Sequence, residues 1–221
     1  AGKGGKAGKA GKAGKGEGGR VNSEKLLRTF EAQGVRCACV VDGRYVWTGQ
    51  RDGVVVRDID KGEELHRVET GPFTTGVWAI AHIPFRRKSG KVKSEVWVGT
   101  STGEVLRFGA KDRVTQPSLA RHTGGVYCLH FSALASPAPS VFSGSNDFTV
   151  VQWRASDPPK GSKQTVFFLR QFSGHTNGVR GALALGPKLW TCADDTTLRV
   201  WDLATADCEA VRLGGADSFY G

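Results

Sequence analysis

The chain has 221 residues, of which 39% are apolar and 24% charged, and its formal net charge is +10. This length and composition allow one or two domains with a buried core. No run of about 18 to 20 apolar residues is present to form a membrane helix, and no basic-then-apolar leader opens the chain, so we expect an intracellular protein, cytoplasmic or nuclear.

Residues 1–20 form a basic low-complexity tail. They contain Arg20, one carboxylate (Glu17) and lysines at every third position from Lys3 to Lys15, and so hold half of the net charge. With no apolar residue larger than alanine, this segment is predicted to be disordered. It could attach to nucleic acid, acidic protein or anionic lipid, but a solubilising linker is favoured, because the segment lacks aromatic residues and an amphipathic period.

From residue 21 onward, short alternating apolar runs are separated by Gly, Asp and Asn, which predicts an all-β fold. A Gly-Val pair opens an apolar run four times, with valines 42, 49 and 53 residues apart, the length range of a four-stranded repeat. The valines are Val35, Val77, Val126 and Val179. Each pair is followed by one of four aligned turn motifs, which are WTGQRDG, WVGTSTG, FSGSNDF and WTCADDT.

The last unit shows the expected strands most clearly. They span Val179 to Leu185, Lys188 to Ala193, Thr197 to Leu203 and Cys208 to Leu213, with a tight turn at 194–196.

These units resemble the WD40 repeats of β-propellers. The last unit opens with Gly174-His175 and closes its third strand with Trp201-Asp202, and the third unit matches with His122 and Trp153. The first unit keeps Thr48, Asp52 and Asp58, with Glu31 at the histidine position and no tryptophan. The second has Val98, Thr102 and Phe108 at the serine, aspartate and tryptophan positions.

The resemblance implies an all-β WD40-type β-propeller. Residues 21–221 would form four four-stranded antiparallel blades, at about 32–70, 74–120, 122–173 and 175–214. The family's usual ring has seven blades, so further blades are expected outside this chain, or a second chain completes the ring. Ser23 to Glu31 resembles the outermost strand of a preceding blade. The absence of methionine and the start at Ala1 also favour a piece of a longer protein.

The resemblance also implies a hydrogen-bonded tetrad in each complete blade, in which a Trp N–H reaches a hydroxyl, the hydroxyl a His, and the His the Asp of the tight turn. The fourth unit supplies Trp201, Thr191, His175 and Asp195, and the third supplies Trp153, Ser143, His122 and Asp147. A serine-hydrolase triad is rejected, because the set recurs at the repeat period beside a burying Trp and no GxSxG elbow occurs.

Eight positions are predicted to contact partners on the top face of such a propeller. They follow the anchor valine or precede the turn aspartate, and they are Arg36, Trp78, Tyr127, Arg180, Arg51, Ser101, Asn146 and Asp194. Arg, Trp and Tyr dominate binding hot spots, and arginines beside aromatics suit an acidic or phosphorylated peptide. The alternative is that Trp78 or Tyr127 only packs against a neighbouring blade.

The opposite face is predicted to hold the insertions. Phe85 to Lys93 is expected to be a loop between the first two strands of the second unit, Ala133 to Ser140 takes the same place in the third, and Asp157 to Gln164 follows Trp153. The first is a basic hairpin that could touch RNA, membrane or acidic protein, although a solvated loop is favoured. Its cations are Arg86, Arg87, Lys88, Lys91 and Lys93.

No catalytic, cofactor or metal site is predicted. The five cysteines (Cys37, Cys39, Cys128, Cys192 and Cys208) lack a CxxC or Cys/His ligand spacing, and His66, His82 and His130 are isolated surface or strand residues. The favoured function is a non-enzymatic scaffold for protein partners. One alternative is the propeller region of an inositol-polyphosphate 5-phosphatase-like enzyme, because VWTGQRDGVVVRD is similar to repeats of that class. Another is a ribonucleoprotein component that uses the tail and the basic hairpin.

Overall fold

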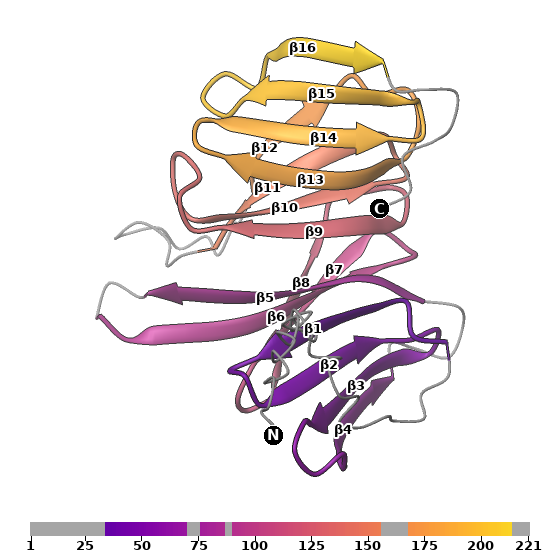
Figure 1. Cartoon of the computed structure of the whole chain (residues 1–221), viewed down its shortest axis with the longest axis vertical. Helices are drawn as coiled ribbons and strands as arrows, with labels where there is room; N and C mark the ends of the chain where they lie inside the picture. The colour runs from indigo at the N-terminus through magenta and orange to yellow at the C-terminus, as the bar shows by residue number, and fades with distance from the viewer. Residues whose placement is uncertain (1–33, 70–75, 87–89, 156–167, 214–221) are drawn as a thin grey trace, which may run out of the picture. The chain divides into compact units, whose positions relative to one another are not determined.

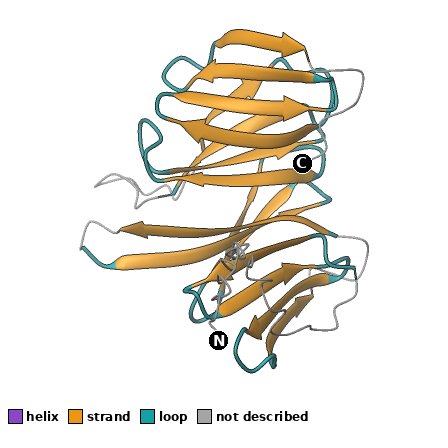
Figure 2. Cartoon of the chain, in the orientation of Figure 1, coloured by secondary structure: helices purple, strands orange, loops and turns teal. Residues whose placement is uncertain are grey.

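The computed structural model describes residues 34–69, 76–86, 90–155 and 168–213 (Figure 1). These residues form sixteen strands, and they contain no helix and hence none that could cross a membrane (Figure 2). The strands make four separate four-stranded sheets in which all neighbours are antiparallel. This confirms the all-β fold and the four-stranded units. The predicted tail, residues 1–20, lies outside the described residues.

The first two sheets are made from consecutive strands. Sheet 1 consists of β1 (Cys37–Val41), β2 (Tyr45–Gly49), β3 (Gly53–Asp58) and β4 (Glu64–Glu69). Sheet 2 consists of β5 (Val77–Arg86), β6 (Val92–Thr100), β7 (Glu104–Gly109) and β8 (Thr115–Ala120). Each of these sheets is therefore formed by one continuous segment of the chain.

The other two sheets repeat this order. Sheet 3 consists of β9 (Val126–Ser132), β10 (Ser140–Ser145), β11 (Thr149–Arg154) and β12 (Phe168–Ser173). Sheet 4 consists of β13 (Val179–Leu185), β14 (Lys188–Ala193), β15 (Thr197–Asp202) and β16 (Cys208–Leu213). In all four sheets an anchor valine starts the first strand or lies two residues before it.

A tight turn joins the second and third strands of sheets 3 and 4. In sheet 4 the N–H of Thr196 donates to the carbonyl three residues earlier at 3.1 Å, and in sheet 3 the N–H of Phe148 does so at 3.2 Å. Both residues have positive φ, +62° and +71°, which is uncommon for residues with a side chain. The aspartates before them, Asp195 and Asp147, are thereby held in the turn, two residues after the second strand ends.

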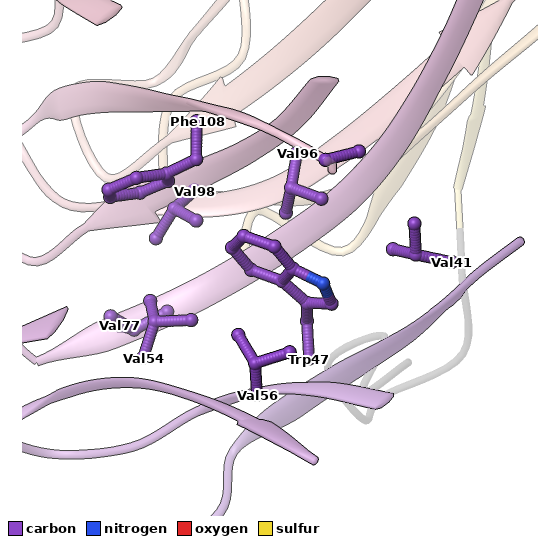
Figure 3. Close-up of a cluster of buried hydrophobic side chains, with 9 residues drawn as sticks. Val41, Trp47, Val54, Val56, Val77, Val96, Val98 and Phe108 are labelled. Carbon is purple, nitrogen blue, oxygen red and sulfur yellow. The ribbon is translucent and has the colours of Figure 1, made fainter. Parts of the chain in front are cut away.

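Consecutive sheets pack face to face through three apolar cores. Between sheets 1 and 2, the ring of Trp47 lies among Val56, Val96, Val98 and Phe108, and all five are at most 1% exposed (Figure 3). Apolar surface removed from water stabilises a fold by roughly 25 cal/mol per Å². These cores are therefore the main attraction between neighbouring sheets.

A glycine near the end of the second strand allows each sheet to approach the next. A Cβ atom on Gly49 would lie only 2.3 Å from Cγ1 of Val77, the anchor valine of sheet 2. The equivalent pairs are Gly99 with Val126, at 2.6 Å, and Gly144 with Val179, at 2.8 Å. The Gly-Val pairs that revealed the repeat thus supply the valines of these inter-sheet contacts.

Sheet 4 has exposed apolar residues on strands β13 and β14. Leu183 is 53% exposed, Leu185 68% and Trp190 37%. Leu183 and Trp190 are cross-strand partners, so they lie on the same face of the sheet. The described residues leave this apolar face open.

Most predicted strand bounds in the last unit agree with the structure, since only β15 differs, ending at Asp202.

The prediction of a loop over Phe85 to Lys93 was wrong. Strand β5 continues to Arg86, and Phe85 pairs with Lys93 on β6. The reason is burial, because Phe85 is only 8% exposed and belongs to the core between sheets 2 and 3. The predicted loop at Ala133 to Ser140 does connect β9 to β10, although Ser140 already belongs to β10, and Asp157 to Gln164 lies outside the described residues.

Candidate functional site

Sheet 4 contains a chain of hydrogen bonds that begins at a buried tryptophan. Trp201 Nε1 donates to Thr191 Oγ1 at 2.8 Å, and His175 Nε2 lies 2.7 Å from the same oxygen. On the other side of the ring, His175 Nδ1 lies 2.7 Å from Asp195 Oδ2. A carboxylate only accepts, so Nδ1 carries the proton and Nε2 accepts from the threonine hydroxyl. The four groups form one continuous network.

Sheet 3 holds the same arrangement. Trp153 Nε1 donates to Ser143 Oγ at 2.7 Å, His122 Nε2 lies 2.7 Å from that oxygen, and His122 Nδ1 lies 2.9 Å from Asp147 Oδ2. The structure thus brings together both sets of four residues that the sequence register selects.

Each network has a fifth member that the sequence interpretation missed. Thr197 Oγ1 donates to Asp195 Oδ1 at 2.7 Å, and Thr149 Oγ1 donates to Asp147 Oδ1 at the same distance. The signal was available, because a threonine follows each turn aspartate by two residues. Ser/Thr and Asp side chains near turns commonly bond to each other and to the local backbone.

The electrostatics of sheet 4 favour a neutral histidine beside an ionised aspartate. Burial lowers the pKa of His175, although Asp195 opposes this shift. Burial alone would raise the pKa of the Asp195 carboxyl, but hydrogen bonds from Thr197, the Thr176 N–H and His175 lower it to about 2. In sheet 3, the hydrogen bonds of Asp147 likewise outweigh burial and lower its pKa.

These groups have a structural arrangement and not a reactive one. Ser143 is 0% exposed and its oxygen already accepts the Trp153 N–H, so an incoming substrate would not reach it. Burial also raises the pKa of the Cys39 and Cys128 thiols to about 12, which keeps them protonated and unreactive at neutral pH. Among the described residues, no three His, Cys, Asp or Glu side chains cluster as metal ligands.

Sheet 2 contains a buried ion pair in place of the histidine network. The carboxylate of Glu95 accepts Trp97 Nε1 at 2.9 Å and Arg107 Nη2 at 2.9 and 3.1 Å, and Lys93 Nζ also contacts it. Glu95 is 0% and Arg107 4% exposed. Val98 and Phe108, which occupy the serine and tryptophan positions of the repeat, lie in the apolar core, and Thr102 is exposed.

Sequence reasoning missed this ion pair. The available signal was a pair of opposite charges, one in each of two adjacent apolar runs, SEVWVG and VLRFG. Since charged residues are almost never fully buried unless paired, such a pattern indicates a buried ion pair.

Sheet 1 keeps only parts of the repeat's polar pattern. Thr48 Oγ1 donates to the carbonyl of Val55 at 3.2 Å, and Asp52 is exposed. Asp58 accepts the N–H groups of Asp60 and Lys61, which resembles the way Asp202 of sheet 4 accepts two backbone N–H groups. The third strands of sheets 1 and 4 therefore end on equivalent aspartate-capped turns.

Four of the predicted contact residues form a continuous stack across all four sheets. The rings of Trp78 and Tyr127 are stacked, with centroids 4.7 Å apart and an interplanar angle of 4°. The Arg36 guanidinium lies 5.4 Å from the centroid of Trp78, and the Arg180 guanidinium lies 3.9 Å from that of Tyr127. We call these four residues the ladder. Each member follows the anchor valine of its own sheet.

Two further predicted contact residues hold the ladder in place. Tyr127 Oη donates to Asn146 Oδ1 at 2.9 Å, and Arg180 Nε donates to Asp194 Oδ2 at 2.8 Å. The sequence interpretation treated Arg180 as a cation available to an acidic ligand, but the structure neutralises it with Asp194. Trp78 and Tyr127 also pack against each other across sheets 2 and 3, as the structural alternative predicted.

The last two of the eight predicted positions lie outside the stack. Arg51 is exposed on the turn between β2 and β3, and Ser101 follows β6, where its N–H donates to the carbonyl of Gly76 at 2.9 Å.

The basic hairpin is only partly described. Arg87 and Lys88 lie outside the described residues, Arg86 ends β5, and Lys91 is exposed. Lys93 pairs with the buried Glu95 and is not a free surface cation, which corrects its predicted role.

The isolated histidines all lie in strands, His66 in β4, His82 in β5 and His130 in β9. His82 Nε2 contacts the hydroxyl of Ser94, and burial lowers its pKa.

Residues 114–154 and 167–202 match the family model described as WD domain, G-beta repeat. The chain therefore contains WD40 repeats in these two segments. An uncharacterized WD repeat-containing protein of Schizosaccharomyces pombe is 24% identical over 149 residues, which are 66% of this chain and 36% of that protein. The nuclear distribution protein PAC1 of Eremothecium gossypii is 35% identical over 75 residues, covering 30% of this chain and 16% of PAC1.

Solved structures support a WD40 β-propeller-like fold. The structure of U3-55K aligns with a TM-score of 0.65 at 20% identity, over 85% of this chain and 54% of that one. The computationally designed Ika8 protein aligns with a TM-score of 0.62 at 23% identity, over 83% of this chain and 50% of that one. The chain thus spans about half of each solved chain and about a third of the S. pombe relative.

The two WD40 matches coincide with the two complete tetrads. Each match begins at the outermost strand of one sheet, β8 or β12, and ends at the third strand of the next, β11 or β15. Sheet 1 and most of sheet 2 lie outside the matches and lack the tetrad.

Proposed function

We propose that this chain is a non-catalytic WD40 scaffold that binds a protein partner within a larger complex, and that the partner contacts the ladder and its flanking residues. Residues 21–221 form the propeller part in this proposal, and residues 1–20 form a linker. The observation that carries it is the continuous stack of Arg36, Trp78, Tyr127 and Arg180, with one residue contributed by each sheet.

The composition and fixation of the ladder suit a binding surface. Arg, Trp and Tyr are the residues most enriched among interface hot spots. Tyr127 and Arg180 are already held by Asn146 and Asp194, so little side-chain freedom is lost when a partner docks. Preorganisation of this kind raises affinity by reducing the entropic cost of binding.

The ladder gives no support to RNA binding by base stacking. One face of Trp78 is stacked on Tyr127 and a guanidinium lies over the ring of each, so the π-faces that bases would need are occupied. A protein partner would instead meet ring edges, guanidinium groups and the loops around them.

The proposal is tested with the double variant Trp78→Ala/Tyr127→Ala in the tagged chain, by quantitative mass spectrometry of proteins that copurify from cells of the source organism. We expect the specific copurifying set to be lost while far-UV circular dichroism stays unchanged. The matched control is Leu134→Ala, because Leu134 is 87% exposed in the β9–β10 loop. A copurifying set that is identical for wild type, control and double variant would reject the proposal.

We also propose that further blades, to the usual family count of seven, cover the open face of sheet 4. The support is the exposure of Leu183, Leu185 and Trp190, since each of the three described inter-sheet interfaces buries an apolar core. Purified residues 21–221 should then self-associate or unfold without a cooperative transition. A compact monomer that unfolds in one sharp transition would count against this proposal.

A further inference from the structure

Two arginine–tryptophan pairs have the same spacing, and only one of them binds a carboxylate. In sheet 2 the Arg107 guanidinium lies 5.4 Å from the centroid of Trp97, and the Glu95 carboxylate accepts from Trp97 Nε1 and from the guanidinium. In the ladder the Arg36 guanidinium lies at the same 5.4 Å from the centroid of Trp78. The buried pair of Arg107 and Trp97 shows that a carboxylate satisfies this combination of donors.

The donors of the ladder pair have no acceptor among the described residues. Trp78 Nε1 is buried and makes no hydrogen bond to any of them. Arg36 is exposed, and among the described residues no carboxylate forms an ion pair with it. A buried N–H without a partner is unfavourable, because it has lost its hydrogen bond to water and gained none in return.

Gly76 leaves space beside these two donors. A Cβ atom on Gly76 would lie 3.1 Å from Trp78 Nε1 and 3.4 Å from Arg36 Nη1, so both donors border the same small region. The indole nitrogen is buried, so an oxygen atom reaches it only if a neighbouring side chain shifts. Arg36 is the exposed neighbour, and its long side chain can follow an incoming carboxylate.

We propose that Arg36 and Trp78 bind a glutamate or aspartate side chain of an acidic segment in the protein partner. This inference rests on the proposed function and assigns a ligand to the sheet 1 end of the ladder. The guanidinium would hold the carboxylate by charge-assisted hydrogen bonds, and the indole N–H would donate to one of its oxygens, as Arg107 and Trp97 do for Glu95.

The distribution of charge along the ladder favours this end. Arg180 is neutralised by Asp194 at the sheet 4 end. At the sheet 1 end, Arg51 is exposed. Its neighbour Gln50 connects it to the ladder, because the carbonyl of Gln50 accepts the N–H of Val77, the residue before Trp78, at 3.0 Å. At the site itself, the Arg36 guanidinium and the Trp78 N–H match the single charge and two oxygens of a carboxylate better than a phosphate dianion with its additional acceptors.

The test is an NMR titration of the ¹⁵N-labelled chain with a soluble (Glu-Gly)5 peptide, followed at the tryptophan indole N–H signals. Trp78→Phe assigns the Trp78 signal and removes the donor while keeping an aromatic ring in the stack. We expect the Trp78 signal to shift with the glutamate peptide and not with (Gln-Gly)5. We also expect Arg36→Gln to weaken binding of the glutamate peptide about tenfold, the loss expected for one hydrogen bond to a charged group. The control is Lys91→Gln, which removes an exposed positive charge from the hairpin between β5 and β6 and should leave the affinity unchanged.

The outcomes separate this inference from the proposed function. If the copurifying proteins are lost with Trp78→Ala/Tyr127→Ala but retained with Trp78→Phe and Arg36→Gln, the interaction face stands and the carboxylate site is wrong. The carboxylate site is also wrong if the glutamate peptide leaves the Trp78 signal unmoved, or if a (phosphoserine-Gly)5 peptide binds tightly and the glutamate peptide does not. If no variant changes the copurifying set, both proposals fall.

Discussion

Sheets 2 and 4 share one strand topology but tie their strands together with different polar chemistry. In sheet 4 a neutral histidine connects Trp201 through Thr191 to the carboxylate of Asp195. In sheet 2 two charged residues, Glu95 and Arg107, connect the second and third strands directly. The fold therefore requires that buried polar groups be satisfied, and more than one set of residues meets that requirement.

The two solutions respond differently to the loss of one partner. A histidine network is made of neutral groups and one carboxylate, which keeps its hydrogen bonds from Thr197 and the Thr176 N–H when the histidine is lost, so each lost bond costs a moderate amount. An ion pair in the core leaves an unpaired charge behind, which is far more costly. Substitutions in the two sheets therefore measure how strongly the stability of each sheet depends on its buried polar contacts.

The largest effect is expected from Glu95→Ala in sheet 2. Removing the carboxylate strands the buried Arg107, and breaking a buried ion pair in this way costs about 3 to 5 kcal/mol. The measurement is the free energy of unfolding from urea denaturation at pH 7.5. The matched control is the double variant Glu95→Met/Arg107→Leu, which replaces both charges by apolar groups and should recover most of the loss. A single variant that loses less than about 1 kcal/mol, the range of an exposed pair, would show that the pair contributes little.

A smaller effect is expected from His175→Ala in sheet 4. The substitution leaves Thr191 and Asp195 without their shared partner, and unsatisfied buried groups cost about 1 to 3 kcal/mol each, so we expect a loss of about 2 to 3 kcal/mol. Urea denaturation again provides the value. Asp52→Asn is the control, because Asp52 takes the position of Asp195 in sheet 1 but is exposed, and surface changes usually stay within about 0.5 kcal/mol. Equal losses for both variants would argue against a structural role for the histidine network.

The sequence predicted the histidine network because its members recur at fixed offsets. In both units the hydroxyl precedes the turn aspartate by four residues and the tryptophan follows it by six, so Thr191 and Ser143 could be placed by register. The charges of the sheet 2 ion pair cannot be placed in this way. The positions equivalent to Glu95 and Arg107 in sheet 3 are Ser140 and Gln152, which are neutral, buried and hydrogen-bonded at 2.9 Å, so the repeat specifies the contact but not its charges.

The sequence placed the four ladder residues at equivalent positions of the repeat but did not reveal their contacts with one another. The register selected Trp78 and Tyr127 correctly as equivalent residues of consecutive units, but only the packing of β5 against β9 shows that their rings stack. The Arg180–Asp194 pair follows from an antiparallel hairpin that brings residue 180 opposite the turn at 194. Equivalent positions in a repeat do not reveal which neighbours will satisfy each other.

The smallest expected effect is a change with pH in the free energy of unfolding that His175→Ala costs. This change distinguishes sheet 4 from sheet 2, because their buried polar groups differ in protonation. Burial lowers the pKa of His175, with Arg199 acting in the same direction and Asp195 against it. A histidine whose folded pKa lies below its unfolded value of about 6.5 destabilises the fold as pH falls through that range, because the unfolded chain binds the proton more readily. The cost of His175→Ala should therefore shrink between pH 7.5 and pH 5. Glu95, whose pKa lies below its usual value, stays ionised over this range, so the cost of Glu95→Ala should remain constant. Urea denaturation of both variants and the wild type at the two pH values measures this difference. An equal pH dependence for the two variants would contradict the assignment of a neutral histidine to sheet 4 and an ion pair to sheet 2.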